Sequence, residues 1–498
     1  MAATRVIVIG SGFSGLAAAT SLADRGYDVT VLEKNSTPGG RARSFSSNGF
    51  TFDMGPSWYW MPDVFESYFQ KFGKSTLDYY NLKRLDPSYA VIFGEDDFMD
   101  VPAQLSQMRQ LFESMEPGSA AQLDRFLEQA AYKYEVGINQ LVYKPGRSLT
   151  EFMNPRLLLD VLRMDVFQSF HKHIRRFFQH EKIVKLMEFP ILFLGALPQN
   201  TPALYSLMNY ADISLGTWYP MGGMYKIVEG MVRLAKEKGV KFMYNQNVSR
   251  LEVQDGSVTH VQTDTGTFEA EVVVASADYH HVEKKLLAKS HQSYSDSYWE
   301  SRTMAPSSLL FYLGVNKRLQ KLRHHNLFFD EDFGPHAQEI YTHPQWPTKP
   351  LFYVSAPSVT DPGVAPEGCE NLFILIPVAP GLEDSEELRE KYFNLVMDRL
   401  ERLTKQEIRS HIIYKRSYAH KDFIQDYNAF KGNAYGLANT LLQTAILKPS
   451  LKSKKVKNLF YTGQLTVPGP GVPPSLISGQ VVAREVEKEY APPVAVNV

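Results

Sequence analysis

The chain has 498 residues, a formal net charge of −1 at pH 7 and one cysteine, Cys369. This length exceeds what a single hydrophobic core usually holds, so we expect two or more lobes. The near-zero charge gives no general attraction to nucleic acid, and one cysteine excludes an internal disulfide and a multi-cysteine metal site. The cysteine count also fits a reducing compartment, and we expect a cytoplasmic protein.

Residues 5–33 show the pattern of a nucleotide-binding βαβ unit. A β-branched run precedes Gly10, Gly12 and Gly15, apolar residues follow at helical spacing, and a second strand ends at Glu33. Gly10 allows a tight turn, Gly12 lets a pyrophosphate approach the backbone, and Gly15 lets the helix pack closely on the strand. Glu33 can accept hydrogen bonds from an adenosine ribose. The pattern predicts a dinucleotide site, and a glycine-rich turn without a ligand is the alternative.

The residues after Glu33 narrow the choice of nucleotide. Pro38-Gly39-Gly40-Arg41 follows a short loop, and residues 50–57 give an alternating strand and a tight turn. This arrangement resembles the amino-terminal FAD region shared by amine oxidases, carotenoid desaturases and Rab escort-type proteins. The resemblance implies FAD as the cofactor, with contacts from Gly10, Gly12, Phe13, Ser14, Gly15, Glu33, Lys34, Gly40, Arg41, Gly55, Pro56 and Ser57.

Two helices separated by Pro117-Gly118 are expected over residues 104–131, and the character of the chain changes after residue 158. One apolar face is formed at steps of three and four by Phe167, Phe170, Ile174, Phe177 and Phe178. A basic face lies beside it. This pattern predicts either a helix in an anionic membrane interface or a surface helix that docks its aromatic face on the core. The neighbouring histidines have no spacing typical of a metal site, so we expect no metal.

The middle of the chain is expected to contain a helix, strands and a hairpin. The helix covers residues 225–238, a strand covers 240–244, the hairpin turns at Asp255-Gly256, and an apolar strand covers 268–275. This order resembles the middle part of the same flavoprotein fold. There, the strand at Asn247-Val248 packs by the adenine, so Val248 is a candidate cofactor contact.

Further strands and helices are expected in the second half of the chain. Strands are expected at 308–315, 351–354 and 372–378, and a charged surface helix at 383–403. A basic stretch between Lys448 and Lys457 is typical of a solvated loop.

The carboxyl end is expected to complete the cofactor site. A strand over 458–463, a rigid loop over 464–474 and a helix over 475–489 follow one another. Glycines let the backbone approach a flat ring, and the helix N-terminus can face a flavin. The candidate contacts are Gly463, Gln464, Gly471, Val472 and Pro473.

Separated segments match one family across essentially the whole chain: residues 10–43, 52–60, 219–224, 356–368 and 458–479. The protein resembles a bacterial-type phytoene desaturase of the flavin amine oxidase superfamily. The resemblance implies an α/β fold with a Rossmann-like FAD-binding domain of the amine oxidase/glutathione reductase type, a mixed-sheet substrate domain and a helical, membrane-facing lobe. We assign residues 1–80, 221–300 and 435–492 to the FAD-binding domain. Residues 81–100 and 301–434 are assigned to the substrate domain, and residues 101–220 to the helical lobe.

The family implies desaturation of phytoene toward lycopene by hydride transfer to flavin and proton loss. In this reaction the cofactor performs the hydride transfer, which explains why no catalytic triad is visible in the sequence. A glutamate at Glu151 takes the position of the family's proposed acid/base residue, although no arginine clearly takes the partner position. Oxygen or a membrane quinone is the expected electron acceptor. No stretch reaches the roughly 18 apolar residues of a spanning helix, so we expect peripheral membrane association.

Several alternatives stay open within the same fold. The substrate can be a hydroxylated carotenoid or diapophytoene, and the reaction can be carotenoid isomerisation, ketolation or a retinol saturase-like step. An amine oxidase or a non-redox escort protein is a more distant alternative. Neither the number of desaturation steps nor the oligomeric state follows from the sequence.

Overall fold

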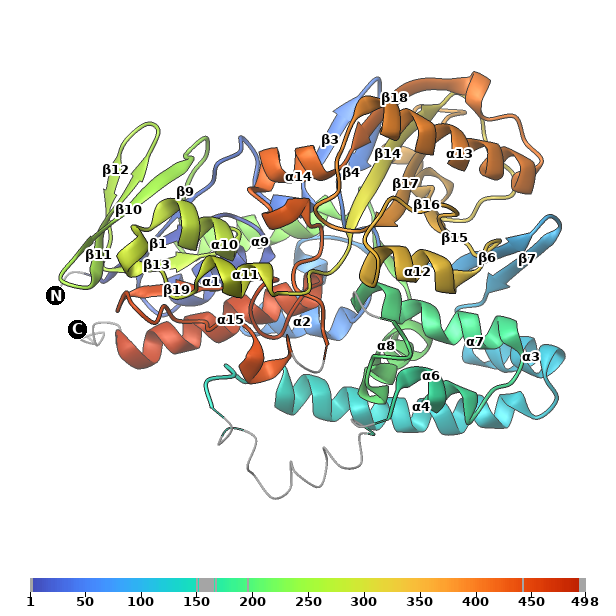
Figure 1. Cartoon of the computed structure of the whole chain (residues 1–498), viewed down its shortest axis with the longest axis horizontal. Helices are drawn as coiled ribbons and strands as arrows, with labels where there is room; N and C mark the ends of the chain where they lie inside the picture. The colour runs from blue at the N-terminus through green and yellow to red at the C-terminus, as the bar shows by residue number, and fades with distance from the viewer. Residues whose placement is uncertain are drawn as a thin grey trace.

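The computed structural model describes residues 3–148, 151, 165, 168–194, 197–440 and 443–491, and a parallel sheet lies in one half of it (Figure 1). Its five strands lie in the order β19 (Leu459–Tyr461), β13 (Val272–Ala275), β1 (Arg5–Ile9), β2 (Asp28–Leu32) and β9 (Lys241–Met243) (Figure 1). β1 is in the middle, so the carboxyl end of β1 faces a crevice between neighbouring strand ends. The predicted βαβ unit and the predicted strands at 240–244 and 458–463 are confirmed.

Three helices pack together beside this sheet: α1 (Phe13–Ala23), α9 (Tyr225–Glu237) and α15 (Val472–Glu489). α1 is fully buried over its first turns, which explains its run of small and apolar residues. A Cβ added to Gly15 would lie 2.1 Å from the carbonyl oxygen of Gly10, and one added to Gly479 would lie 2.2 Å from the carbonyl oxygen of Ser14. Both glycines are therefore required for close backbone packing, between β1 and α1 and between α1 and α15.

A seven-stranded mixed sheet lies in the other half of the molecule (Figure 1). Its order is β18 (Ile412–Tyr418), β14 (Ser307–Val315), β17 (Glu370–Val378), β16 (Phe352–Ser355), β15 (His325–Phe328), β6 (Tyr89–Gly94) and β7 (Asp97–Val101). Only β15 and β6 pair in parallel. α13 (Glu386–Thr404) packs on one face through Phe393, Val396 and Leu400, while Leu310 and Phe373 point from the opposite face toward the middle of the molecule. α13 is thus a half-buried helix and not a purely charged surface helix.

The antiparallel meander differs in one detail from the sequence-based expectation. β10 (Val248–Gln254) and β11 (Ser257–Thr263) form the predicted hairpin. The expected strand over 268–275 is divided into β12 (Thr267–Glu269) and β13. The division arises because β12 pairs antiparallel with β11, whereas β13 pairs parallel with β1. A change of sheet within one apolar run cannot be read from its hydrophobicity.

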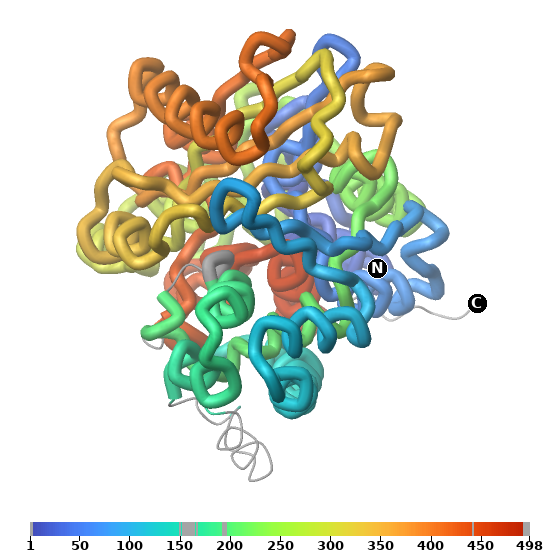
Figure 2. Tube along the Cα trace, turned by 90° about the vertical axis from the view of Figure 1, so that its right-hand side faces the viewer, coloured from blue at the N-terminus to red at the C-terminus, as the bar shows by residue number. Residues whose placement is uncertain are grey.

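The helical part of the chain lies on the other side of the seven-stranded sheet from α13 (Figures 1 and 2). It contains α3 (Leu105–Met115), α4 (Ser119–Val136), α6 (Phe170–Arg175), α7 (Glu181–Glu188) and α8 (Leu207–Asn209). The predicted helix pair around Pro117-Gly118 is confirmed by α3 and α4. No helix within the described ranges is long and apolar enough to cross a membrane.

The aromatic face predicted around residue 170 packs on the core. Phe170, Ile174 and Phe178 are completely buried, and the rings of Phe112 and Phe126 contact that of Phe178. These three side chains are unavailable to a membrane, so the membrane interpretation of this face is wrong for them, and the docking interpretation is confirmed. Phe167 lies outside the described residues. His171 and His173 contact Glu188 and Lys133, respectively, and no group of side chains suited to a metal occurs in the described part of the chain.

The remaining elements connect these layers. They are β3 (Ser44–Ser47) paired with β4 (Phe50–Asp53), β5 (Leu82–Arg84) paired with β8 (Trp218–Pro220), and the helices α2 (Pro62–Gln70), α10 (Tyr279–His281), α11 (Asp296–Glu300), α12 (Phe333–Tyr341) and α14 (His420–Tyr427). The parallel sheet draws its strands from the three segments assigned to cofactor binding, and the mixed sheet from the two assigned to the substrate. The domain boundaries themselves stay a prediction.

We expect Gly479→Ala to lower the free energy of unfolding by about 2 to 3 kcal/mol, because the added methyl group would overlap the backbone of α1. The midpoint of denaturant unfolding measures this change. Gly266→Ala is the matched control, because a Cβ there meets no atom within 4 Å. Equal unfolding midpoints for the two variants would contradict the close packing of α1 on α15.

Candidate active site

A cavity of about 400 Å³ opens where the ends of β1, β2 and β13 meet the first turns of α1 and α15. Almost every residue predicted to contact the cofactor lines it, although these residues come from widely separated segments. They are Gly10, Gly12, Phe13, Ser14, Glu33, Lys34, Gly40, Arg41, Gly55, Pro56, Ser57, Val248, Gly463, Gln464, Gly471, Val472 and Pro473. Gly15 is absent from the lining, because its role is the packing of α1 on β1.

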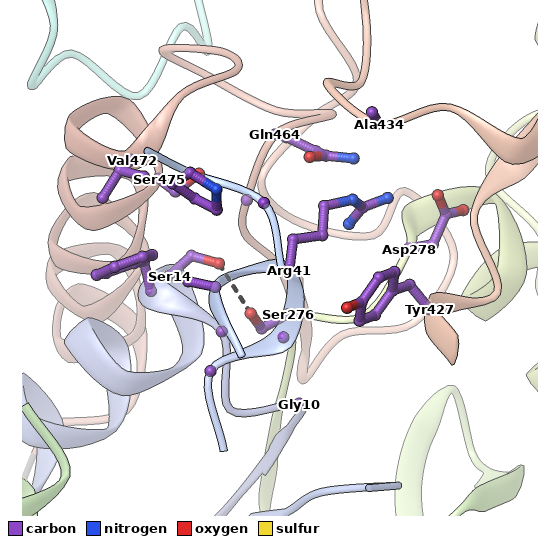
Figure 3. Close-up of a pocket in the computed structure, with 18 of the residues that line it drawn as sticks. Gly10, Ser14, Arg41, Ser276, Asp278, Tyr427, Ala434, Gln464, Val472 and Ser475 are labelled. Atoms are coloured by element: carbon purple, nitrogen blue, oxygen red, sulfur yellow. Dashed lines mark hydrogen bonds between the residues drawn. The ribbon is translucent and has the colours of Figure 1, made fainter. Parts of the chain in front are cut away.

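The turn between β1 and α1 leaves backbone groups facing the cavity. Gly10 has a φ of 94°, which favours glycine, and α1 begins after Gly12 with no side chain capping its N-terminus. The hydroxyl groups of Ser14 and Ser276 are 2.8 Å apart (Figure 3). A Cβ added to Gly463 would lie 3.2 Å from the Ser14 hydroxyl oxygen. An uncapped helix N-terminus with little surrounding side-chain bulk is suited to a pyrophosphate.

Glu33 is buried at the end of β2, where it receives four hydrogen bonds. Ser11 donates from its backbone N and its Oγ to Oε2 at 2.9 and 2.6 Å. Asn35 donates from its backbone N and its Nδ2 to Oε1 at 2.8 and 3.0 Å. The carboxylate therefore fixes the turn after β1 as well as presenting negative charge at the place expected for a ribose.

We expect Glu33→Gln to weaken FAD binding by about tenfold, because an amide cannot accept all four hydrogen bonds and lacks the charge that strengthens them. Fluorescence titration of the apoprotein with FAD measures the dissociation constant. Glu367→Gln, at an exposed position, is the control. The same dissociation constant for both variants would contradict the role of Glu33.

Arg41 is the cation at the centre of the cavity, between Gln464 and the pair Asp278 and Tyr427 (Figure 3). Burial lowers the pKa of Arg41, and the charge of Asp278 opposes this effect. Its Nη2 donates to the carbonyl oxygen of Asn433 at 3.3 Å, its guanidinium lies 5.3 Å from the Tyr427 ring centroid, and its Nε has no hydrogen-bond partner. A half-buried guanidinium with a free N–H suits an anionic or carbonyl-bearing ligand.

Sequence reasoning missed three residues beside Arg41: Ser276, Asp278 and Tyr427. Burial raises the pKa of Asp278, while Arg41 and the backbone N–H groups of His281 and Phe430 oppose this effect. Ser276 and Asp278 follow directly after β13, so the rule that ligands bind at the carboxyl ends of parallel strands could have found them. Tyr427 carries no comparable signal, because α14 is distant in sequence.

The carboxyl-terminal loop closes one side of the cavity. Gly463, Gly469 and Gly471 all have positive φ values, and Gln464 Nε2 donates to Asn433 Oδ1 at 3.2 Å. α15 begins at Val472, earlier than the predicted Ser475. The earlier start arises because proline is tolerated in the first turn of a helix, where its missing N–H has no partner to lose.

Another part of the cavity wall is mainly apolar. The mixed sheet contributes Leu310, Tyr353, Phe373 and Leu375, and other segments contribute Trp58, Trp60, Met61 and Met208. Trp60 and Met61 both line the cavity and belong to the main core. An apolar wall that continues from a nucleotide turn is suited to a hydrophobic substrate next to a cofactor.

Glu151 is not among the residues that line the cavity. Its carboxylate accepts hydrogen bonds from the backbone N–H groups of Gly146, Arg147 and Ser148 at 2.9, 2.8 and 3.2 Å. These contacts stabilise the loop that precedes Glu151. The catalytic role of Glu151 stays a prediction without support from its position.

Lys448 is buried, contrary to the expected solvated loop. Its side chain is 6% exposed, its Nζ has no hydrogen-bond partner, and burial lowers its pKa to about 7. In the unfolded chain its pKa is about 10.4, so between pH 7 and that value the folded state binds fewer protons than the unfolded state. The contribution of Lys448 to stability therefore rises with pH in this window.

We expect Lys448→Met to stabilise the fold at pH 7, because it removes an unpaired buried amine. This advantage over the wild type should shrink by about 2 kcal/mol between pH 7 and pH 9. Denaturant unfolding of both proteins at the two pH values measures it. The exposed Lys455→Met serves as the control, and a pH-independent difference for Lys448→Met would contradict the lowered pKa.

Comparisons with known proteins agree with this site. The family described as flavin containing amine oxidoreductase matches residues 13–487. A carotenoid 3,4-desaturase of Haloarcula japonica is 40% identical over 491 residues, which cover 98% of this chain and 98% of the relative. A zeta-carotene-forming phytoene desaturase of Myxococcus xanthus is 34% identical over 97% of this chain and 93% of its own length. An oxidoreductase from Methanosarcina mazei shares the fold, with a TM-score of 0.64 and 15% identity over 97% of this chain and 100% of that one.

The chain thus belongs to the flavin-containing amine oxidoreductases. Within this class it is a carotenoid desaturase, an FAD-dependent oxidoreductase. The predicted family, cofactor and α/β fold are confirmed, and the amine oxidase and escort protein alternatives are set aside. The cation Arg41, the uncapped turn before α1 and the glycine-lined carboxyl loop fit the phosphates and the flat ring of FAD.

Proposed function

We propose that this enzyme desaturates phytoene toward lycopene. The observation that carries the proposal is the apolar wall of Leu310, Phe373, Leu375 and Met208, which continues from the nucleotide turn in one cavity. Phytoene is a hydrocarbon without polar groups, so its binding depends on the shape and length of such a wall. The named activity of the Myxococcus xanthus relative supports the same substrate.

The residues of the cavity suggest where FAD binds. We propose that Gly10, Gly12 and Ser14 contact the pyrophosphate, that Glu33 contacts the ribose, and that Val248 packs by the adenine. Arg41 and the loop from Gly463 to Pro473 would then contact the flavin part of FAD. When bound, FAD accepts the hydride that a saturated carbon of the substrate loses. The protein orients the polyene and excludes water.

A second candidate is desaturation at the 3,4 position of a carotenoid. It is favoured by the 40% identity to the Haloarcula japonica enzyme, against 34% to the phytoene desaturase. This reaction acts near one end of a chain that is already conjugated. The two candidates therefore differ in how far the substrate must enter the cavity.

We expect the purified holoenzyme to convert colourless phytoene in liposomes into products with structured visible absorption. Chromatography of the products gives the number of steps, and parallel samples supplied with a quinone or with oxygen identify the electron acceptor. Lycopene-loaded liposomes test the second candidate, and enzyme stripped of FAD is the control. If phytoene stays unchanged while FAD is bound, the proposal is wrong, and consumption of lycopene would favour 3,4-desaturation.

Peripheral membrane association belongs to the same proposal, because a hydrocarbon of this kind dissolves in the bilayer. Phe170, Ile174 and Phe178 are buried, so these side chains cannot provide the contact. Sedimentation of the same liposome samples measures whether the enzyme binds them.

A further inference from the structure

Tyr353 and His325 form a hydrogen-bonded pair in the apolar wall of the cavity. Tyr353 lines the cavity, and its hydroxyl oxygen is 2.5 Å from His325 Nδ1. The register of β15 and β16 explains this contact: His325 lies opposite Ser355, so Tyr353 is its diagonal neighbour on the same face of the sheet. Phe373 and Leu375 on β17 lie beside Tyr353. The pair is therefore a polar contact in the part of the cavity suited to a hydrocarbon.

His325 is completely buried and has one unused nitrogen. Its exposed fraction is 0%, and its Nε2 has no hydrogen-bond partner. Burial lowers the pKa of His325, and the neighbouring His324 adds to this effect, so the imidazole is neutral at rest. The Trp58 ring stacks on it with centroids 4.1 Å apart and an interplanar angle of 11°. An aromatic face stabilises a positive charge placed against it.

A second cavity lies behind this wall. It has a volume of about 20 Å³ and is lined by polar side chains, among them Asp53, Ser57, Tyr219, His324, Ser355 and Asn371. A polar cavity of this size can hold one water molecule. Ser57 lines both cavities, and the rings of His324 and His325 are 4.5 Å apart. Asp53 is buried there with a pKa raised to about 6 by burial.

The carboxylates that line the main cavity are already engaged. Glu33 receives four hydrogen bonds, Asp278 contacts two backbone N–H groups and lies by Arg41, and Asp426 Oδ2 accepts from Arg43 and Tyr418 at 2.6 and 3.0 Å. All of them belong to the polar side of the cavity. On the apolar wall beside Phe373 and Leu375, the Tyr353 hydroxyl has a proton acceptor, His325 Nδ1, behind it.

We propose that Tyr353, with His325 behind it, receives the proton that the carotenoid loses during desaturation. The substrate loses a hydride, with two electrons, which bound FAD would accept, and a C–H bond on the carbon next to the resulting cation then breaks. The electrons of that bond form the new double bond. The proton binds to Tyr353 Oη, while the original hydroxyl proton moves to His325 Nδ1. After the product leaves, His325 Nδ1 returns its proton to Tyr353 Oη and the hydroxyl proton passes to water in the main cavity, so the resting pair is restored.

The strength of the base suits the substrate. A buried neutral imidazole is a weak base, so it cannot remove a proton from an intact hydrocarbon. A carbocation is a strong acid, so it can transfer a proton even to a weak base. The pair therefore acts only after the hydride has left, which prevents isomerisation of the resting substrate.

Tyr353→Phe keeps the ring and removes the hydroxyl, and His325→Gln keeps a hydrogen-bond acceptor and removes the basic nitrogen. Tyr392→Phe is the matched control, because it also removes a buried hydroxyl, which donates to the carbonyl oxygen of Pro347. Tyr392 lies on α13, which packs against the opposite face of the sheet. The holoenzymes are mixed anaerobically with the carotenoid that the wild type converts. Flavin bleaching counts the hydrides transferred, and mass spectrometry counts the products.

We expect one desaturated product for each reduced flavin in the wild type and in Tyr392→Phe. In Tyr353→Phe and His325→Gln we expect flavin reduction within about threefold of the wild-type rate, at least a tenfold lower yield of desaturated product, and water adducts of the trapped cation. An unchanged yield for each reduced flavin would overturn the proposal. Parallel loss of flavin reduction and product would also overturn it, because that pattern indicates substrate placement.

This inference rests on the proposed desaturation reaction. A measurement that uses no substrate therefore has to test the Tyr353–His325 pair separately. Nitrogen-15 NMR of the histidines, with His325 assigned through the His325→Gln spectrum, supplies one. We expect a neutral His325 with hydrogen on Nε2 at pH 7, and loss of the hydrogen-bond shift at Nδ1 in Tyr353→Phe. A charged ring, or hydrogen on Nδ1, would overturn the relay even if neither phytoene nor lycopene is converted. Failure of both substrates with the expected NMR result would affect only the proposed function.

Discussion

The close approach of three backbone segments at α1 determines where everything else in the site can lie. Gly15 allows α1 to contact the turn at Gly10, and Gly479 allows α15 to contact α1 at Ser14. Because α15 follows the loop from Gly463 to Pro474, this contact brings the carboxyl end of the chain to the amino-terminal turn. A side chain at either glycine would separate the two halves of the cofactor site by the thickness of a methyl group.

The electrostatics of the cavity follow from that geometry. The turn after β1 concentrates backbone N–H groups, and Glu33 stabilises the turn by accepting two of its hydrogen bonds from Ser11. Arg41 enters from the next loop, and its positive charge counteracts the rise that burial causes in the pKa of Asp278. On the far side of the cavity the mixed sheet supplies side chains with few polar atoms. The polar and apolar sides correspond to a charged cofactor and an uncharged substrate.

Local features of the sequence were sufficient to predict residues that line one cavity, whereas features that depend on tertiary contacts could not be predicted. Gly10, Gly12 and Glu33 have fixed spacing because one strand, one turn and one helix must fit a pyrophosphate. The partner of the aromatic face at Phe170 could not be predicted. An amphipathic pattern indicates that one face is covered, but it does not distinguish a membrane from the protein core. Lys448 lies in a basic stretch, which predicts a solvated side chain, but tertiary packing buries it. The pairing of Tyr353 with His325 depends on strand register between segments separated by a loop and a helix, which residue types alone do not specify.

The absence of a strong base from the apolar wall of the described cavity is consistent with the chemistry of desaturation. A charged carboxylate placed among Leu310, Phe373 and Leu375 would lose its hydration and would destabilise the fold. A tyrosine hydroxyl with an imidazole behind it carries no charge at rest, so it can be buried at small cost. Charge appears there only when the substrate itself has become a cation and can transfer its proton. In this arrangement the driving force for the second half of the reaction comes from the substrate, and the protein needs only to place a neutral acceptor beside it.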